Sequence, residues 1–170
     1  MRPHRYRHDP SKSLVGFLVG DVRYAISIAA VREISKPLSI VALPHAPATV
    51  LGVADFRGEV IPVLDMRARF GLPPAVDTSR AKWVVVAVEG RMAALAVDAV
   101  TDVFGTANAA LSPAPPLGGG EIRRGISGVI NHEGRMVFVL DAARLNETVH
   151  AIADLGGRAD VARLLDKGSS

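Results

Sequence analysis

Gly52–Asp65 reads GVADFRGEVIPVLD, and Gly128–Asp141 reads GVINHEGRMVFVLD. The two stretches align without a gap at an offset of 76 residues (128 − 52). Each is an apolar run, a turn containing glycine, and a second apolar run that ends in Leu-Asp. This pattern predicts a β-hairpin. The chain therefore carries two copies of one hairpin.

Two further pairs of β-rich runs predict hairpins elsewhere in the chain. Each pair flanks a two-residue turn with glycine, which adopts positive φ without steric penalty. The runs are Leu14–Val19 and Val22–Ile28 around Gly20-Asp21, and Trp83–Val88 and Arg91–Val97 around Glu89-Gly90. VRYAISIAAVREI from residue 22 also matches RMAALAVDAVTDV from residue 91, at an offset of 69 (91 − 22). The repeat extends along most of the chain and predicts two related β subdomains.

The composition suits a folded domain of this kind. The chain has 170 residues, of which 49% are hydrophobic, enough for one domain or two closely packed subdomains. Short strands separated by glycine and proline turns favour small β-barrels, because closure removes exposed sheet edges. Asp65 and Asp141 each end a strand, and we expect their side chains to N-cap short helices.

The positive charge is concentrated at the N-terminus. The tail carries four basic residues against one acidic residue, which leaves 16 basic and 16 acidic residues after Lys12 (20 − 4 and 17 − 1). These tail residues are Arg2, Arg5, Arg7 and Lys12 against Asp9. The sequence predicts a basic flexible tail over residues 1–13, with contact to an acidic surface as the alternative.

The C-terminus carries a helical pattern. Leu145, Val149 and Ile152 stand at helical spacing, and a glycine pair follows before a second apolar set. We expect residues 146–170 to form a helical extension. It packs on the barrels, self-associates or recruits another molecule.

The sequence offers no catalytic constellation. The chain has no cysteine, and His4 and His8 are its one pair with metal-ligand spacing, placed in the polar tail. Gly118–Gly120 lacks the Lys-Ser/Thr of a phosphate loop. Asp98 and Asp102 are expected as solvated carboxylates rather than as an acid–base pair. We therefore predict a protein that is not an enzyme, with no catalytic residues, metal site or cofactor.

Other classes of partner and location are also disfavoured. No apolar stretch approaches the roughly 20 residues of a membrane-spanning helix, and the N-terminus is too polar for a secretory signal. A nucleic-acid-binding β-barrel remains an alternative, but it predicts a basic stripe with exposed aromatic residues, whereas the chain after Lys12 is neutral. We expect a cytoplasmic binding module.

The two copied hairpins differ at the turn. The first reads Phe56-Arg57-Gly58, and the second reads His132-Glu133-Gly134 at the same places. Glycine repeats for reasons of turn geometry, but Arg57 does not. An exposed charge at a hairpin tip is by default only solvated, so this difference permits a functional interpretation without requiring one.

A series of motifs resembles the CheW family, the adaptors of bacterial chemosensory systems. These motifs are VRYAISIAAVREI, ALPHAPATVLGVADFRGEVIPVLDMRARFGL, ALAVDAVTDVFG, SPAP and GISGVINHEGRMVFVLDAARL, in this order. The resemblance covers residues 14–145. It implies a mainly β fold of two small SH3-like five-stranded β-barrel subdomains with short helices, in agreement with the repeat.

The resemblance implies coupling without catalysis. Such adaptors link the cytoplasmic tip of a chemoreceptor to the regulatory domain of a CheA-type histidine kinase, without direct insertion in the membrane and within receptor arrays. Val31, Glu33, Arg57 and Gly58 match the receptor-contact positions, while the kinase-binding residues stay unknown. A divergent adaptor that binds receptors but not the kinase, and that controls motility or development, is the main alternative.

One position departs from the family pattern. Asp55 stands where family members most often carry asparagine, two residues before Arg57. Pairing between the two would make Arg57 less available to a partner. We expect their side chains to point to opposite faces of the strand, so that Arg57 stays available. A buried scaffold role for Arg57 is an equal alternative to direct contact.

Overall fold

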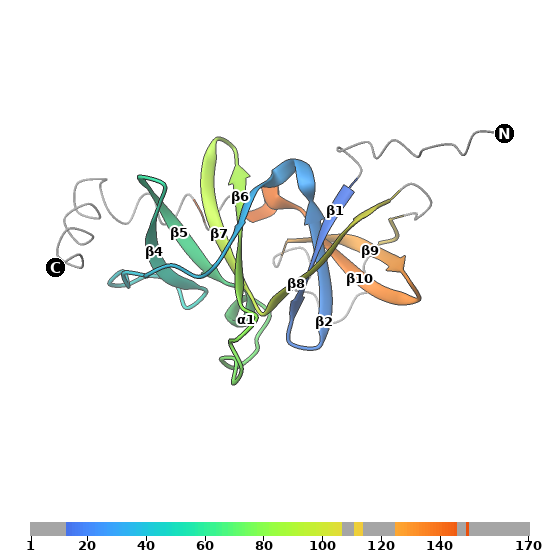
Figure 1. Cartoon of the computed structure of the whole chain (residues 1–170), viewed down its shortest axis with the longest axis horizontal. Coiled ribbons are helices and arrows are strands. Elements are labelled where there is room, and N and C mark those ends of the chain that lie inside the picture. The colour runs from blue at the N-terminus through green and yellow to red at the C-terminus, as the bar shows by residue number, and fades with distance from the viewer. Residues whose placement is uncertain (1–12, 107–110, 114–124, 146–148, 150–170) are drawn as a thin grey trace.

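The computed structural model describes residues 13–106, 111–113, 125–145 and 149 (Figure 1). The predicted basic tail lies outside the described residues apart from Ser13, with which the first strand begins. The predicted C-terminal extension lies outside them apart from Val149. Along the described chain the elements are β-strands joined by turns and by three short helices.

The elements follow one another in the order β1 (Ser13–Val19), β2 (Val22–Ser27), η2 (Ile28–Ala30), β3 (Val31–Ser35), β4 (Val50–Phe56), β5 (Glu59–Asp65), α1 (Met66–Arg69), β6 (Lys82–Val88), β7 (Arg91–Val97), β8 (Ala99–Gly105), β9 (Ile126–His132), β10 (Arg135–Leu140) and η3 (Ala142–Leu145). All four predicted hairpins are present as β1–β2, β4–β5, β6–β7 and β9–β10.

The strands form two five-stranded mixed sheets. Sheet 1 has the order β8-β1-β2-β10-β9, and sheet 2 has the order β3-β6-β7-β5-β4. Each sheet contains one parallel pair, β2 with β10 and β7 with β5, among antiparallel neighbours. In Figure 1 sheet 2 occupies the left half of the molecule and sheet 1 the right. The predicted mainly β fold with two five-stranded subdomains is confirmed.

The two sheets do not coincide with the two halves of the sequence. Sheet 1 combines β1 and β2 with β8, β9 and β10, so the blue and orange strands lie together in Figure 1. The chain crosses between sheets at Ile28–Ala30 and again at Asp98, which are equivalent positions at the offset of 69. Each sheet therefore contains strands from both copies of the repeat, and neither forms from one half alone.

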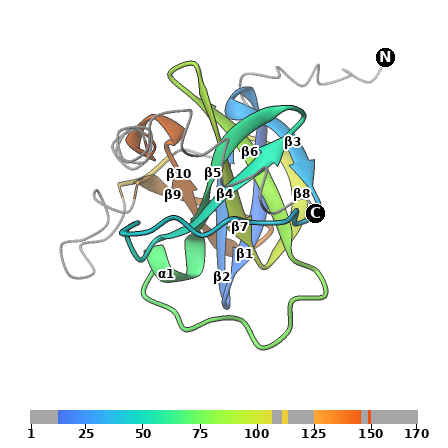
Figure 2. The same cartoon turned by 90° about the vertical axis from the view of Figure 1, so that its left-hand side faces the viewer.

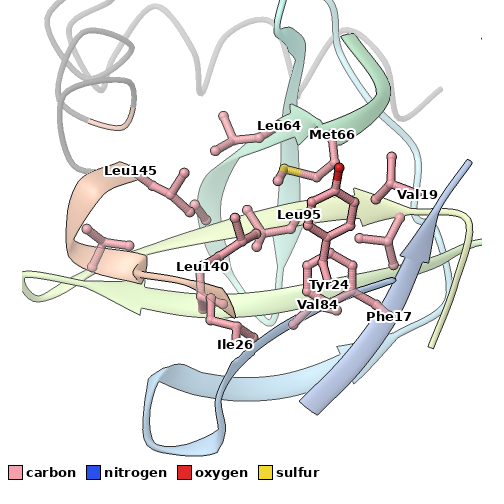
Figure 3. Packing of buried hydrophobic residues seen from close by; sticks show 14 of the residues in the cluster. Phe17, Val19, Tyr24, Ile26, Leu64, Met66, Val84, Leu95, Leu140 and Leu145 are labelled. Atoms are coloured by element: carbon pink, nitrogen blue, oxygen red, sulfur yellow. The ribbon is translucent and has the colours of Figure 1, made fainter. Parts of the chain in front are cut away.

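A shared hydrophobic core lies between the sheets. Val15, Phe17 and Val19 of β1 pack there together with Val84 and other residues of sheet 2 (Figure 3). Leu14, which precedes Val15 and points to the opposite face, packs instead inside sheet 1. Since both faces of β1 are covered, its sequence is nearly continuous in apolar residues rather than alternating.

Each sheet also encloses a smaller apolar cluster of its own. In sheet 2 this cluster is Ala54, Phe56, Ile61, Val63, Trp83, Val85 and Ala94. In sheet 1 it is Leu14, Ala25, Phe104, Ile130 and Val137. Buried hydrophobic residues therefore lie in three places, namely the shared core and one cluster in each sheet. This arrangement suits a chain of which 49% of the residues are hydrophobic.

The glycine that opens each copied hairpin admits a close backbone approach. At Gly52, where φ is +146°, an added Cβ would lie 2.1 Å from the carbonyl oxygen of Val41. At Gly128 it would lie 2.6 Å from the carbonyl oxygen of Ser112. Val41 and Ser112 each form a β-bridge to the valine that follows the glycine. The same close approach of a backbone carbonyl to a glycine thus occurs in both copies.

The two predicted aspartate caps are present. The side chain of Asp65 accepts a hydrogen bond of 3.2 Å from the backbone N–H of Ala68 in α1. The side chain of Asp141 accepts one of 3.0 Å from the N–H of Ala143 in η3. Leu145, the last residue of η3, and Val149 are buried in the shared core, so this end of the domain packs between the sheets.

Candidate functional site

The turn between β4 and β5 places Arg57 at a hairpin tip. Arg57 and Gly58 have φ of +50° and +82°, as a two-residue type I′ turn requires. The carboxylate of Asp55 accepts a hydrogen bond of 2.9 Å from the N–H of Gly58. Glu133 and Gly134 repeat the conformation, with φ of +53° and +75°. The turn geometry is common to both copies, whereas the side chain it presents is not.

Arg57 forms an ion pair with Glu33 of β3. Its Nη2 contacts one carboxylate oxygen of Glu33, and its Nε lies 3.3 Å from the other. Because β3 and β4 are the two outer strands in the order of sheet 2, the pair joins opposite edges of that sheet. We call this pair the sheet 2 brace.

The brace lies at the surface. The side chain of Arg57 is 72% exposed and that of Glu33 is 33% exposed. The hydrogen bond from Arg57 holds the pKa of Glu33 below its ordinary value of 4.5, and the same bond raises the pKa of Arg57. The guanidinium also lies 5.6 Å from the ring centre of Phe56. A buried scaffold role for Arg57, one of the two roles considered from the sequence, is wrong.

Asp55 does not pair with Arg57, but for a different reason from strand alternation. Asp55 bonds to the backbone of Gly58, and Arg57 pairs with Glu33. Residues two apart on a strand would share a face, so alternation alone does not separate Asp55 from Arg57. The separation arises because Arg57 lies beyond the end of β4, in the turn.

The structure brings together three of the four residues expected at the receptor contact. Glu33, Arg57 and Gly58 meet at the tip of the hairpin, where an added Cβ on Gly58 would find no atom within 4 Å. Val31 begins the same strand as Glu33 but is half-buried against the shared core. It supports the strand beneath the brace.

Sequence reasoning missed two exposed aliphatic residues on the strands that carry the brace. Ile34 follows Glu33 on β3 and is 40% exposed, and Val60 follows the turn on β5 and is 41% exposed. Both occur inside apolar strand patterns that read as buried. Only the folded structure indicates that these two side chains are exposed.

Sheet 1 carries a brace at the equivalent place. Nε2 of His132 lies 3.0 Å from Oδ2 of Asp102, which joins the outer strands β9 and β8. Asp102 corresponds to Glu33 at the offset of 69 (102 − 33), and His132 corresponds to Phe56 at the offset of 76 (132 − 56). The imidazole stacks on Phe104, with ring centres 3.8 Å apart. We call this pair the sheet 1 brace.

The neighbours of the sheet 1 brace repeat those of the other brace. Val103 and Met136 are 55% and 58% exposed and correspond to Ile34 and Val60. Partial burial raises the pKa of Asp102, but hydrogen bonds from Thr101 and His132 outweigh it and leave that pKa below its ordinary value. The expectation that Asp98 and Asp102 are merely solvated is wrong, since Asp98 also forms an ion pair, with Arg67.

Nothing in the described residues resembles a metal centre or a membrane span. Within residues 13–106, 111–113, 125–145 and 149, no group of three or more His, Cys, Asp or Glu side chains could hold a metal ion. In the same residues no helix is long and apolar enough to cross a membrane. The two braces and their exposed aliphatic neighbours are the surface features that we consider for function.

The comparisons with known proteins agree with this arrangement. The model of the CheW-like domain matches residues 13–150. The chain belongs to the CheW family. It is 38% identical to the chemotaxis protein CheW of Rhizobium meliloti (strain 1021) over 130 residues, which cover 76% of this chain and 84% of the relative.

Other CheW relatives and a solved structure extend the comparison. The chain is 28% identical to the protein FrzA of Myxococcus xanthus over 141 residues, 82% of this chain and 88% of that protein. The crystal structure of the scaffolding protein TtCheW from Thermoanaerobacter tengcongensis superposes with a TM-score of 0.69 at 27% identity, covering 77% and 89% of the two chains. As a CheW-family member, the chain is a chemotaxis scaffold or adaptor rather than an enzyme.

Proposed function

We propose that this protein is a non-catalytic adaptor that couples the cytoplasmic tip of a chemoreceptor to the regulatory domain of a CheA-type histidine kinase. Membership of the CheW family supports this role. The observation that carries the proposal is the sheet 2 brace, an exposed ion pair at the edge of a sheet with aliphatic residues beside it. The adaptor works in the cytoplasm and is recruited to membrane receptor arrays.

The receptor tip contacts the sheet 2 brace. Arg57 is held by Glu33 and by a tight turn, so little side-chain freedom is lost on binding. Its guanidinium has five N–H donors, and those not used by Glu33 can donate to acceptors on a helical tip. Ile34 and Val60 supply apolar area around the polar contact. Gly58 allows the partner backbone to approach the turn.

The kinase regulatory domain contacts the other edge of the molecule. By resemblance this domain is itself a related double barrel, so partner and adaptor meet through the ends of their barrels. Val103 and Met136 expose aliphatic surface beside the sheet 1 brace. Each contact is modest on its own, because an array is stabilised by many weak interfaces acting together.

The proposal is tested by titrating the purified full chain against a receptor tip fragment and, separately, against the isolated kinase regulatory domain. Arg57→Glu reverses the charge at the first turn, and Glu133→Arg reverses it at the equivalent position of the second. We expect Arg57→Glu to weaken receptor binding by roughly 30-fold, as for a central arginine of an interface. Glu133→Arg serves as the matched control and leaves receptor binding unchanged.

The outcomes separate the adaptor from its alternatives. If wild type binds both partners and Arg57→Glu weakens only the binding of the receptor fragment, the two-surface adaptor is supported. Binding to the receptor fragment alone identifies a divergent adaptor that occupies receptors without engaging the kinase. If wild-type protein binds neither partner, the coupling proposal is wrong.

A further inference from the structure

Asp98 ties the second crossing between the sheets to the first hairpin of sheet 1. It lies between β7 of sheet 2 and β8 of sheet 1. Its backbone N–H donates a hydrogen bond of 2.9 Å to the carbonyl oxygen of Leu18 in β1. Its carboxylate accepts a hydrogen bond of 2.7 Å from the N–H of Gly20 in the β1–β2 turn. One residue thus fixes the crossing to both the strand and the turn.

Arg67 approaches the same carboxylate from sheet 2. It lies in α1, directly after β5, at the lower centre of Figure 1 where strands of both sheets meet. Its Nε donates to Oδ1 of Asp98 at 2.9 Å, and its Nη2 lies 2.8 Å from Oδ2. Its Nη1 donates to the carbonyl oxygen of Pro73 at 2.8 Å. Both side chains are about four-fifths covered, with exposures of 22% and 20%.

An aromatic contact lies at the same junction. Phe70, which caps α1, stacks on Tyr24 of β2 with ring centres 4.3 Å apart and planes 4° apart. Leu72 lies so close to the β1–β2 turn that an added Cβ on Gly20 would be 2.8 Å from its Cδ1. Figure 2 shows α1 at the lower left of the molecule, with the loop that follows it running along the bottom. The ion pair therefore borders an apolar contact between the two sheets.

The equivalent junction on the other side has no such ion pair. The offset of 69 places Ala29 at the counterpart of Asp98 (98 − 69), and the offset of 76 places Ala143 at the counterpart of Arg67 (67 + 76). A methyl group can neither accept nor donate a hydrogen bond. At the crossing through Asp98, by contrast, one carboxylate is held by the guanidinium of Arg67 from sheet 2 and by the backbone N–H of Gly20 from sheet 1.

We propose that Arg67 and Asp98 are a positioning pair that holds the two sheets in one relative orientation and so transmits a change at the sheet 2 brace to the sheet 1 edge. The shared core supplies most of the free energy between the sheets, but apolar packing is not directional. Charge-assisted hydrogen bonds are directional and select one packing among similar ones. This signalling role rests on the proposed function, whereas the structural role does not.

The structural role is tested by measuring the distance between one spin label on each sheet. The chain has no native cysteine, so Arg91→Cys on β7 and Arg135→Cys on β10 label sheet 2 and sheet 1 specifically. Double electron–electron resonance then gives the distribution of distances between the two spin labels, with Asp98 intact and with Asp98→Ala. We expect the distribution to broaden or shift in Asp98→Ala. An unchanged distribution would overturn the proposal.

Two further variants keep this test decisive. Arg67→Lys keeps the charge but loses the second bond to the carboxylate or the bond to Pro73, so we expect a smaller change in the same direction. It replaces Asp98→Ala if that variant does not fold. Arg144→Ala is the matched control, because Arg144 pairs with Asp141 at 3.8 Å and donates to the carbonyl oxygen of Ile126 in β9, so neither contact involves a residue of sheet 2. The control should leave the distribution unchanged.

The signalling role needs a readout other than folding. In the Asp98→Ala protein without spin labels, affinities for the receptor fragment and the kinase domain should each stay within about twofold of wild type. Stimulation of the kinase by receptor in the ternary complex should fall by roughly fivefold or more. Normal stimulation despite a broadened distribution overturns the signalling role. Failure of wild type to bind either partner would instead overturn the proposed function.

Discussion

The two braces occupy the same place in the repeated fold and present opposite charges. In sheet 2, Arg57 supplies the cation from the turn itself and is 72% exposed. In sheet 1, the partner of the carboxylate is His132, which is equivalent to the residue before Arg57. His132 stacks on Phe104 and is 23% exposed. The turn itself presents Glu133, which is 81% exposed. The duplicated backbone fixes where a brace forms, and the side chains fix which charge it presents.

The interior shows the opposite behaviour. Leu64 and Leu140 are equivalent at the offset of 76 (140 − 64), and both are buried in the shared core, 1% and 2% exposed. Packing requires an apolar residue at each of these positions, whereas the surface of each copy is free to diverge. The difference between core and edge therefore separates the residues that the fold requires from those that can differ between the copies.

The largest effect should come from the equivalent core positions. Leu64→Ala and Leu140→Ala each remove a buried side chain from the shared core, which costs about 2–5 kcal/mol of unfolding free energy. Urea unfolding followed by circular dichroism measures both losses. Similar values support a symmetric core. A difference of more than about 2 kcal/mol would contradict it.

The next effect concerns the glycines of the copied hairpins. Gly52→Ala places a methyl group against the carbonyl oxygen of Val41, and Gly128→Ala places one against that of Ser112. Each should destabilise the protein by about 1–3 kcal/mol, or prevent folding. Gly58→Ala meets no atom within 4 Å, so only its positive φ opposes the change, at roughly 1 kcal/mol. Thermal unfolding that ranks Gly58→Ala as the most damaging would refute this reasoning.

A smaller difference is expected between the braces themselves. His132→Ala loses the stack on Phe104 as well as the bond to Asp102, which costs about 1 kcal/mol. Arg57→Ala removes an exposed side chain and should leave the melting temperature unchanged. Differential scanning calorimetry compares the two. Equal destabilisation would mean that Arg57 supports the fold rather than the surface.

The smallest effect is the loss of stability in acid. Partial burial raises the pKa of Asp98, but hydrogen bonds from Arg67 and Gly20 outweigh it and hold that pKa below its ordinary value of 3.8. Because the folded-state pKa is the lower one, this stabilisation is present above pH 3.8 and disappears as the pH falls through the folded-state pKa. Asp98→Asn lacks it. Between about pH 6 and about pH 3, wild type should lose on the order of 0.5 kcal/mol more stability than Asp98→Asn.

Much of the local structure could be predicted from the sequence, but its assembly could not. Turn glycines and β-rich runs located all four hairpins, and the aspartates at the C-terminal ends of the β5 and β10 runs identified both caps. These features depend on residues close together in the chain. The exchange of strands between sheets depends on contacts between distant residues, such as Phe138 beside Tyr24, and no local pattern encodes it.

The candidate site was also predictable only in part, because its residues are distant in the sequence. The broken symmetry at Arg57 singled out the turn, and the resemblance to the CheW family added Glu33. Neither indicated that these two side chains form an ion pair across the edges of a sheet. Asp98 and Arg67 lie 31 residues apart in the sequence, and their contact could be found only in the folded chain.

The most direct test of the central claim is receptor binding by the charge-swapped variant Glu33→Arg/Arg57→Glu. This variant can restore the ion pair of the sheet 2 brace while reversing the charge presented at the turn. Titration calorimetry with the receptor tip fragment compares it with wild type and with Arg57→Glu, after circular dichroism has confirmed the fold of each. The account predicts that the swapped variant stays as weak as Arg57→Glu, because Arg57 itself contacts the receptor. Binding restored to the wild-type level would contradict this and reduce Arg57 to an internal brace.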